Sequence, residues 1–378
     1  MVRLAILGWY GTETLGDRAI LAGLLSLLAD LGEEVEIDLG SIHPFLTERT
    51  LLEDEAFLRS CLRRDPLPLR LFNSRNRREL DAVLRRCDAV AVGGGPLMDV
   101  YEMFMVEYAF AKAKTLRKRT LLLGCGVGPL HFRSCAHSLA HIATRSDLSI
   151  FRDVASLDLC ARLAGRAIGK ALVDPAAFAA EHFLQTAPPP PPATSTVACL
   201  RAFPWKHVGD APAIHRRLSD FLLAHLRLSD RPLLLLPMHY FDVGNDDRDF
   251  LNPLAFAWRD PRVTVQNNPL TLEETLRTFR AAPECVGMRF HSVLLQTLLN
   301  GRNIVLDYSE PQVGKTEGFL RQIGATEYFA GAYANLCRSD DLSRLRPPSP
   351  PFPLPSQRLA AFRREYLDEL KLTLLHPG

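Results

Sequence analysis

The sequence of 378 residues lacks the cysteine patterns that build metal sites or disulfide frameworks. Its eight cysteines are scattered, with no C-x-x-C pair, so neither a zinc site nor a set of disulfides is indicated. Several of them stand in apolar runs, where a free thiol behaves as a small hydrophobic side chain. We therefore expect reduced cysteines, a cytoplasmic location and no metal ion in the site.

Long hydrophobic runs and a one-sided charge are missing as well. No apolar run reaches the roughly 20 residues needed to cross a bilayer, and no signal-peptide pattern precedes the first strand pattern. The 45 basic and 43 acidic residues leave a formal net charge of +2, without a basic block that has aromatic residues interleaved. We expect no nucleic-acid partner. The oligomeric state leaves no signal in the sequence.

The chain is longer than the about 250 to 300 residues at which a single hydrophobic core stops growing, which predicts two domains. Leu-rich and β-branched runs alternate with helix-length segments over residues 1–186, the pattern of a parallel sheet covered by helices. Residues 187–194 contain five consecutive prolines and are predicted to be a polyproline linker. The alternation restarts over residues 195–346, which predicts a second α/β domain.

A proline-rich segment and a charged amphipathic helix occupy residues 347–378, and we expect this helix to pack on the N-terminal domain. The predicted strands of the first domain are residues 3–7, 34–39, 88–92, 120–124, 148–151 and 171–173. Those of the second domain are residues 196–200, 233–236, 263–266, 285–286 and 303–307.

Glycine-rich turns follow three predicted strands of the first domain. Glycine lets backbone N–H groups approach a ligand, and a helix N-terminus after the turn favours an anion. There is no G-x-G-x-x-G fingerprint and no P-loop lysine, so neither a dinucleotide nor a P-loop nucleotide is indicated. A tight turn capped by Asp17 is the structural alternative for the first of them, but three turns at the ligand-binding edge of a sheet favour a site. The site residues expected here are Gly8, Tyr10, Gly11, Gly16, Asp17, Gly93, Gly94, Gly95 and Asp99.

The second domain supplies charged side chains at equivalent points. Each follows a predicted strand, and a lone histidine or arginine there would ordinarily be structural. Several at the ends of successive strands predict a site. They are Arg201, His239, Arg289, His291 and Lys315.

The motifs of the chain also occur together in one known family. They are G-W-Y-G-x-x-x-x-G-D near the start, G-G-G-x-x-x-D, G-x-G-V-G-P, F-R-D-x-x-S at 151–156, D-P at 174–175 and G-M-R-F-H at 287–291. In this order, over most of residues 1–324, the sequence resembles the polysaccharide pyruvyl transferases. The resemblance implies two Rossmann-like domains with parallel sheets, in a glycosyltransferase-B-like arrangement with the active site in the interdomain cleft. It also implies transfer of pyruvate from phosphoenolpyruvate onto a sugar as a ketal, with release of phosphate.

Such a reaction needs cations for the phosphate and carboxylate of the donor, for which Arg152, Arg201, Arg289 and Lys315 are the candidates. The enol carbon gains a proton while a sugar hydroxyl loses one, which suits histidine. We assign catalysis to His291, Arg289 and His239, with no cofactor beyond the donor itself. Candidates for holding the acceptor hydroxyls are Asp17, Asp99, Asp246 and Asp247, although each could equally be a helix cap or a loop residue.

The expected partners are phosphoenolpyruvate and a glycan or lipid-linked sugar, and a lipid-linked acceptor would bring the protein to a membrane surface. Thr14 stands where the family usually has asparagine, and the turn of residues 308–315 is longer than usual, which bears on the acceptor. A nucleotide-sugar glycosyltransferase of the same architecture is one alternative, but no carboxylate for its ribose pocket can be identified. A non-catalytic sugar- or phosphate-binding protein is the other, against which the complete set of cations and histidines argues.

Overall fold

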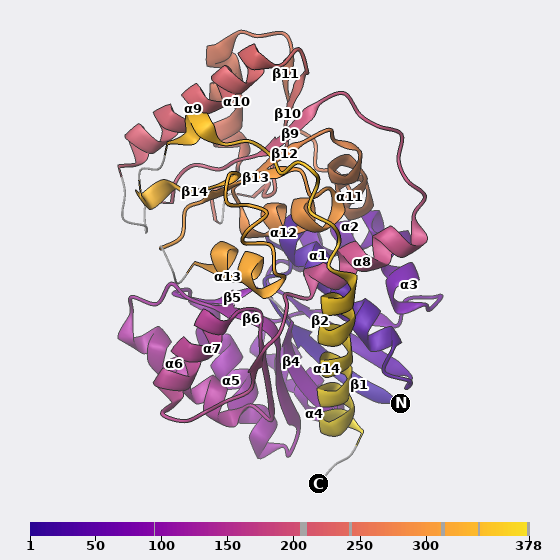
Figure 1. Cartoon of the computed structure of the whole chain (residues 1–378). Coiled ribbons are helices and arrows are strands. Elements are labelled where there is room, and N and C mark those ends of the chain that lie inside the picture. Colours follow the sequence, from indigo (N-terminus) through magenta and orange to yellow (C-terminus); the bar gives the residue numbers. More distant parts are fainter. Residues whose placement is uncertain (94, 205–209, 242–243, 311–313, 339–340, 376–378) are drawn as a thin grey trace. The chain divides into compact units, whose positions relative to one another are not determined.

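The computed structural model describes residues 1–93, 95–204, 210–241, 244–310, 314–338 and 341–375 (Figure 1). The chain forms two compact units, Met1–His182 with Ser356–Gly378 and Phe183–Pro355. The boundary lies inside helix α8 (Ala176–Thr186), slightly before the expected residue 186, and the proline run belongs to the second unit.

A parallel sheet forms the centre of the first unit. Its strands are β1 (Val2–Leu7), β2 (Val35–Ser41), β3 (Leu69–Asn73), β4 (Ala89–Gly93), β5 (Pro96–Leu97), β6 (Arg119–Val127), β7 (Leu148–Phe151) and β8 (Lys170–Ala171). They are ordered β3-β2-β1-β4-β6-β7-β8, with β5 beside β6. The strand β3 was not predicted, because its L-R-L-F-N sequence lies partly exposed at the sheet edge and lacks the apolar run of a buried strand.

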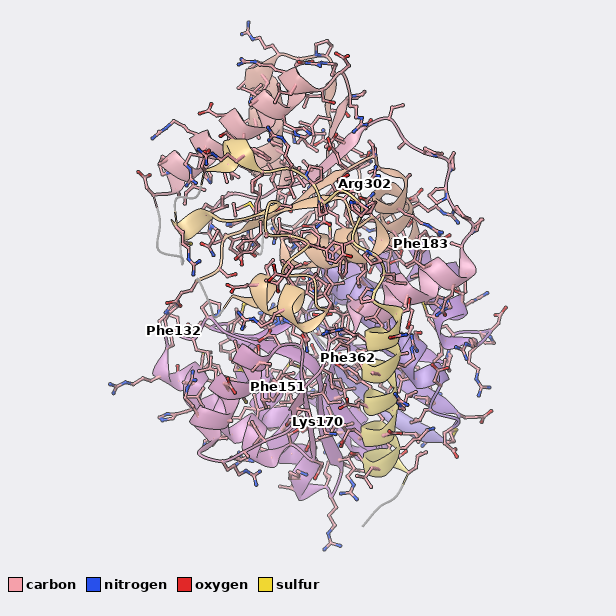
Figure 2. All side chains as sticks on the ribbon, viewed as in Figure 1. Phe132, Phe151, Lys170, Phe183, Arg302 and Phe362 are labelled. Atoms are coloured by element: carbon pink, nitrogen blue, oxygen red, sulfur yellow. The ribbon has the colours of Figure 1, made fainter. Side chains whose placement is uncertain are left out.

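Helices cover both faces of this sheet. They are α1 (Leu15–Ala29), α2 (Pro44–Glu53), α3 (Glu55–Leu62), α4 (Arg77–Arg86), α5 (Glu102–Thr115), α6 (Arg133–Arg145), α7 (Val154–Ala164), α8 and α14 (Ser356–Leu374). Ala5 and Leu7 point into one hydrophobic core with helices α4 to α7. Phe151 is fully buried in that core, whereas Phe132 is exposed, as Figure 2 shows.

The C-terminal helix α14 returns to the first unit, as expected from its amphipathic sequence, and packs against α1 and β7. Arg363 forms ion pairs with Asp30 and Glu181, both at 2.8 Å. The buried hydroxyl of Tyr366 donates to the carbonyl of Val173 at 2.8 Å. Lys170, labelled in Figure 2, lies 2.6 Å from a carboxylate oxygen of Glu369 on this helix. These contacts fix the last segment of the chain on the unit that contains the first.

The second unit repeats the architecture. Its strands are β9 (Thr196–Cys199), β10 (Leu233–Leu235), β11 (Val263–Val265), β12 (Cys285–Gly287), β13 (Asn303–Asp307) and β14 (Tyr333–Asn335), all parallel and ordered β11-β10-β9-β12-β13-β14. Its helices are α9 (Ala211–Leu228), α10 (Arg248–Trp258), α11 (Leu272–Ala281), α12 (Phe290–Leu299) and α13 (Lys315–Gln322), with short 3-10 turns η1 (Leu336–Arg338) and η2 (Leu342–Arg344). The strand β14 has the sequence Y-A-N, which contains no run of apolar residues, and it was not predicted.

Both sheets have the doubly wound order of a Rossmann-like domain, which confirms the predicted fold class. The chain reverses its direction of winding between β1 and β4 in the first unit and between β9 and β12 in the second. In open α/β sheets, ligands bind outside the carboxyl ends of the strands at this switch point. Within the described residues, no helix is long and apolar enough to cross a membrane.

Candidate functional site

The loops after β1 and β4 meet at the switch point of the first unit. The indole Nε1 of Trp9 donates to the carbonyl of Pro96 at 3.0 Å, and the hydroxyl of Tyr10 donates to the carbonyl of Gly93 at 2.8 Å. Gly95 has a φ of +75°, and a Cβ on it would lie 2.0 Å from Cδ1 of Trp9. This glycine is therefore required for two loops to pack closely, which is the structural part of the motif. Gly94 lies outside the described residues.

The other glycines of this part of the site also serve close packing. A Cβ on Gly93 would lie 2.6 Å from Cγ2 of Ile6, and one on Gly11, whose φ is +91°, would lie 2.7 Å from the carbonyl oxygen of His43. A Cβ on Gly8 would lie 2.7 Å from Cε2 of the Tyr10 ring. Gly16 is buried in the first turn of α1. Ligand contacts of these glycines stay a prediction.

The Tyr10 hydrogen bond gives a first test of this packing. We expect Tyr10→Phe to lower the free energy of unfolding by about 1 kcal/mol, because the buried carbonyl of Gly93 loses its side-chain donor. Urea denaturation measures the change. Tyr101→Phe removes a hydroxyl from a tyrosine that is 76% exposed and should leave stability unchanged. Equal stability of Tyr10→Phe and wild type would show that the bond contributes nothing to the loop.

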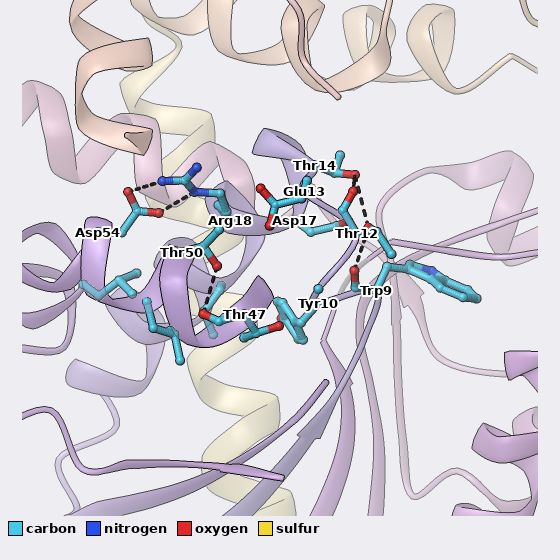
Figure 3. Close-up of a pocket in the computed structure, with 14 residues that line it drawn as sticks. Trp9, Tyr10, Thr12, Glu13, Thr14, Asp17, Arg18, Thr47, Thr50 and Asp54 are labelled. Carbon is cyan, nitrogen blue, oxygen red and sulfur yellow. Dashed lines mark hydrogen bonds and ion pairs between the residues drawn. The ribbon is translucent and has the colours of Figure 1, made fainter. Parts of the chain in front are cut away.

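A small pocket lies beside the β1 loop (Figure 3). Its cavity of about 20 Å³ holds one water-sized group but no sugar ring. Asp17, in the first turn of α1, lines it together with Glu13, whose carboxylate contacts Arg49. Burial raises the pKa of Asp17 to about 7, with the charge of Asp174 adding to the effect and Arg152 opposing it. This end of α1 therefore carries a carboxyl that exchanges protons near neutrality, which suits a hydroxyl better than an anion.

Asp99 and Arg152 are buried in the first unit, each with protein partners. The carboxylate of Asp99 accepts hydrogen bonds from the backbone N–H groups of His131 and Phe132. The Arg152 side chain, only 3% exposed, pairs with Asp174 at 3.3 Å and lies so close to Gly126 that a Cβ there would be 2.3 Å from Nη2. Both residues hold loops at the carboxyl edge of the sheet, and their roles in binding substrate stay predictions.

Three predicted cations converge in the second unit. Arg201 follows β9, Arg289 follows β12 as the N-cap of α12, and Lys315 is the first residue of α13. They meet around Tyr308, which directly follows β13. The guanidinium carbon of Arg201 is 5.6 Å from the centre of the Tyr308 ring, and Nζ of Lys315 is 5.8 Å from it. Arg289 acts on the same phenol through its charge. The structure therefore brings these residues together at the second switch point.

Arg289 is held by a buried carboxylate. Its Nε donates to Asp247 at 2.8 Å and its Nη2 at 2.6 Å, and Asp247, 1% exposed, also accepts the backbone N–H groups of Met238 and His239. Burial by itself lowers the pKa of Arg289, but the charge and hydrogen bonds of Asp247 outweigh it and raise the pKa. In the described part of the chain, no protein partner is found for the Nη1 end of this guanidinium. Asp247 thus orients the permanently charged guanidinium of Arg289 through its Nε and Nη2 atoms, and Nη1 is directed away from this carboxylate.

The remaining predicted residues of the second unit lie near this pair. Asp246 forms an ion pair with Arg248 at 2.5 Å. His239 is 4% exposed, and a Cβ on Gly244 would lie 3.2 Å from its Nε2. His291 stands in the first turn of α12, two residues after Arg289, with its ring centre 5.1 Å from that of Phe290. The roles of Asp246 and Asp247 in holding hydroxyls, and those of the two histidines in proton transfer, stay predictions.

The electrostatics of the second site favour an anionic ligand. Burial lowers the pKa of Arg201, and the charge of Arg289 lowers it further, which records repulsion between two guanidinium groups. Burial alone would raise the pKa of Tyr308, but Lys315, Arg201 and Arg289 outweigh burial and lower it to about 8. Helices α12 and α13 begin beside these cations and add the partial positive charge of their N-termini. An oxyanion would relieve the repulsion and accept several hydrogen bonds.

Sequence reasoning missed two residues of these sites. Tyr308 immediately follows a predicted strand, and its position at the carboxyl edge is the signal that could have identified it. Glu13 gave no signal, because its left-handed backbone conformation, with a φ of 55°, and its burial are visible only in the structure.

The chain has two Rossmann-like units, one with a cationic site at its switch point, and its fold is similar to that of glycosyltransferase-B structures. The S. aureus MnaA–UDP co-structure has a TM-score of 0.58 and 11% identity, covering 98% of each chain. Anabaena Alr3699/HepE in complex with UDP and glucose has a TM-score of 0.56 and 11% identity, covering 98% of this chain and 100% of that one. The lipopolysaccharide outer core galactosyltransferase WaaB, in its apo form, has a TM-score of 0.50 and 12% identity, covering 98% of both chains. At these identities the likeness shows the fold.

Membership of a protein family is shown by the amino-acid sequence. The model of the polysaccharide pyruvyl transferase family matches residues 15–310, which is most of the chain. The protein belongs to the polysaccharide pyruvyl transferase family, as the ordered motifs indicated. A comparison with curated protein sequences gives no match.

Proposed function

We propose that this protein transfers pyruvate from phosphoenolpyruvate onto a sugar of a polysaccharide or lipid-linked glycan, forming a ketal and releasing phosphate. The observation that supports it most directly is the convergence of Arg201, Arg289 and Lys315 around Tyr308. Phosphoenolpyruvate carries both a phosphate and a carboxylate, so it needs more than one cation. Planar guanidinium groups bind either anion through paired hydrogen bonds, and a lysine adds a point charge.

The chemistry begins with protonation of the donor. The electron pair of the C2=C3 bond takes a proton at C3, for which His291 is the proposed acid, and C2 becomes an oxocarbenium ion. A sugar hydroxyl attacks C2 and loses its proton to a base, for which His239 is the proposed residue. Phosphate then leaves with its C–O electron pair, which makes C2 an oxocarbenium ion again. A second hydroxyl of the same sugar adds to C2 and passes its proton to the departing phosphate, which closes the ketal. Holding both hydroxyls near one carbon supplies much of the rate.

The acceptor side of the proposal uses the first unit. Asp17, whose pKa is raised by burial to about 7, is proposed to hold a hydroxyl of the acceptor. No cofactor is proposed, and the described residues contain no group of three or more His, Cys, Asp or Glu side chains placed to hold a metal ion. A cytoplasmic location belongs to the same proposal, supported by eight free cysteines.

A nucleotide-sugar glycosyltransferase is the alternative to be tested, because two of the similar structures contain UDP. A ligand that binds only the folded state raises the melting temperature. At a ligand concentration about 100 times the dissociation constant, the free energy of unfolding increases by about 2.7 kcal/mol. We expect phosphoenolpyruvate to raise the melting temperature by several degrees, and pyruvate, which lacks the phosphate, to have little effect.

The melting temperature with UDP-sugars at the same concentration is the comparison that distinguishes the two donors. Stabilisation by UDP-sugars alone would contradict the proposed donor. Turnover is followed as phosphate released from phosphoenolpyruvate in the presence of a glycan, and the ketal is identified by the NMR signal of its methyl group.

A further inference from the structure

A tyrosine outside all of the sequence motifs lies among the three cations of the second unit. Tyr308 is 6% exposed and directly follows β13. Arg201 faces it from the loop after β9, Lys315 from the start of α13, and Arg289 acts on it from the start of α12. The ring is thus surrounded by positive groups from three different loops at one edge of the sheet.

The direction of the hydrogen bonds follows from the chemistry of these groups. The guanidinium carbon of Arg201 lies 5.6 Å from the centre of the Tyr308 ring. A guanidinium has only donors, so toward this group the phenol oxygen can act only as an acceptor. The ammonium of Lys315 and the guanidinium of Arg289 also have only donors. The phenolic O–H therefore adds one more donor to a set with net positive charge, and an oxyanion is the acceptor that such a set selects.

We propose that Tyr308 is a binding residue of this site, whose O–H donates to an oxygen of the bound phosphate or carboxylate. The inference deepens the proposed function by adding a donor-binding residue. It rests on that function only in taking phosphoenolpyruvate as the natural ligand. The binding step itself requires only a tetrahedral oxyanion.

The charges around the phenol set the pH at which binding changes. Burial raises the pKa of Tyr308, but Lys315, Arg201 and Arg289 bring it down to about 8. Above that pH the phenol is an anion, which repels a second anion and no longer donates a hydrogen bond.

Other titratable groups near this phenol behave differently. Asp247 is paired with Arg289, and the pKa of Asp307 is raised by burial while Ser309, Tyr333 and Lys315 oppose the increase. Cys337, whose thiol lies 3.4 Å from the Tyr308 carbonyl oxygen, has a pKa raised by burial, the opposite direction to that of Tyr308.

Sulfate is a suitable probe because its charge does not change between pH 7 and pH 9. Calorimetric titration of the full chain with sulfate, at constant ionic strength, gives the dissociation constant at each pH. With a pKa of about 8, the protonated fraction of Tyr308 falls from about 0.9 at pH 7 to about 0.1 at pH 9. The dissociation constant of sulfate should therefore rise about tenfold over this range. At pH 7 we expect Tyr308→Phe to bind sulfate about tenfold more weakly than wild type does. The dissociation constant of this variant should be equal at pH 7 and pH 9.

Tyr240→Phe is the matched control, since its hydroxyl donates to the Gln266 carbonyl at 3.3 Å and burial raises its pKa instead of lowering it. This variant should keep the affinity and pH dependence of wild type. The inference is overturned if wild type binds no sulfate at pH 7, if it binds equally at pH 7 and pH 9, or if Tyr308→Phe keeps the tenfold change. Sulfate binding as predicted without phosphate release from phosphoenolpyruvate would instead refute the proposed function alone.

Discussion

Replacing Arg289 with methionine should both weaken donor binding and destabilise the second unit. The variant leaves the carboxylate of Asp247 buried, 1% exposed, and among the described residues its remaining hydrogen bonds come from backbone N–H groups. Removing one partner of a buried ion pair costs about 3 to 5 kcal/mol, because the other charge is then uncompensated. It also removes the Nη1 end of the guanidinium from the site. We expect affinity for phosphoenolpyruvate to fall at least about tenfold, the usual effect of losing a charge-assisted hydrogen bond.

A second substitution separates these two effects. In Asp247→Asn/Arg289→Met no charge is left unpaired, and the amide oxygen can still accept the N–H groups of Met238 and His239. Urea denaturation should show this double variant to be more stable than Arg289→Met, whereas titration with phosphoenolpyruvate should show no recovery of binding. Recovery of affinity together with stability would mean that Arg289 only supports the fold.

The fold was predictable from the sequence wherever strands are buried on both faces. The strands β1, β4 and β6 contain the apolar runs 4–7, 89–92 and 121–123, because helices cover both sides of the sheet. The strand β3 carries Arg70 at the sheet edge, and β14 has the sequence Y-A-N, so neither contains such a run. The unit boundary shifted from residue 186 to residue 182 because α8 is one continuous helix, whose division depends on tertiary contacts.

The position of the candidate site could be predicted from the sequence, but the ion pairs of its cations could not. Arg201, Arg289 and Lys315 each follow a strand, and parallel strands bring their carboxyl ends to one edge, so their convergence follows from topology. The sequence gives no information on which carboxylate each cation contacts. Asp247 looked like a residue for a hydroxyl, and the structure shows it holding Arg289. Arg152 looked like a fourth cation for the donor, and it is buried beside Asp174 in the first unit.

His291→Ala should abolish turnover while leaving the fold and donor binding intact. His291 lies in the first turn of α12, two residues after Arg289, so its Cα is fixed by a helix that is otherwise almost entirely buried. Positioned acids and bases contribute about 10²- to 10⁴-fold to rate, and phosphate release from phosphoenolpyruvate should fall by that factor. The melting temperature and its increase with phosphoenolpyruvate should match wild type, because the Arg and Lys side chains proposed to bind the anion are unchanged.

His291→Gln distinguishes proton transfer from positioning. Glutamine keeps a hydrogen-bonding side chain of similar reach but has no group that titrates, so an acid at this position predicts the same loss as for alanine. If glutamine restores most of the rate, His291 orients the donor and the proton comes from another group. His239→Gln then becomes the decisive comparison, since His239 follows β10 in the same unit and its backbone N–H is already held by Asp247. A full rate in both variants would remove His291 and His239 from the mechanism.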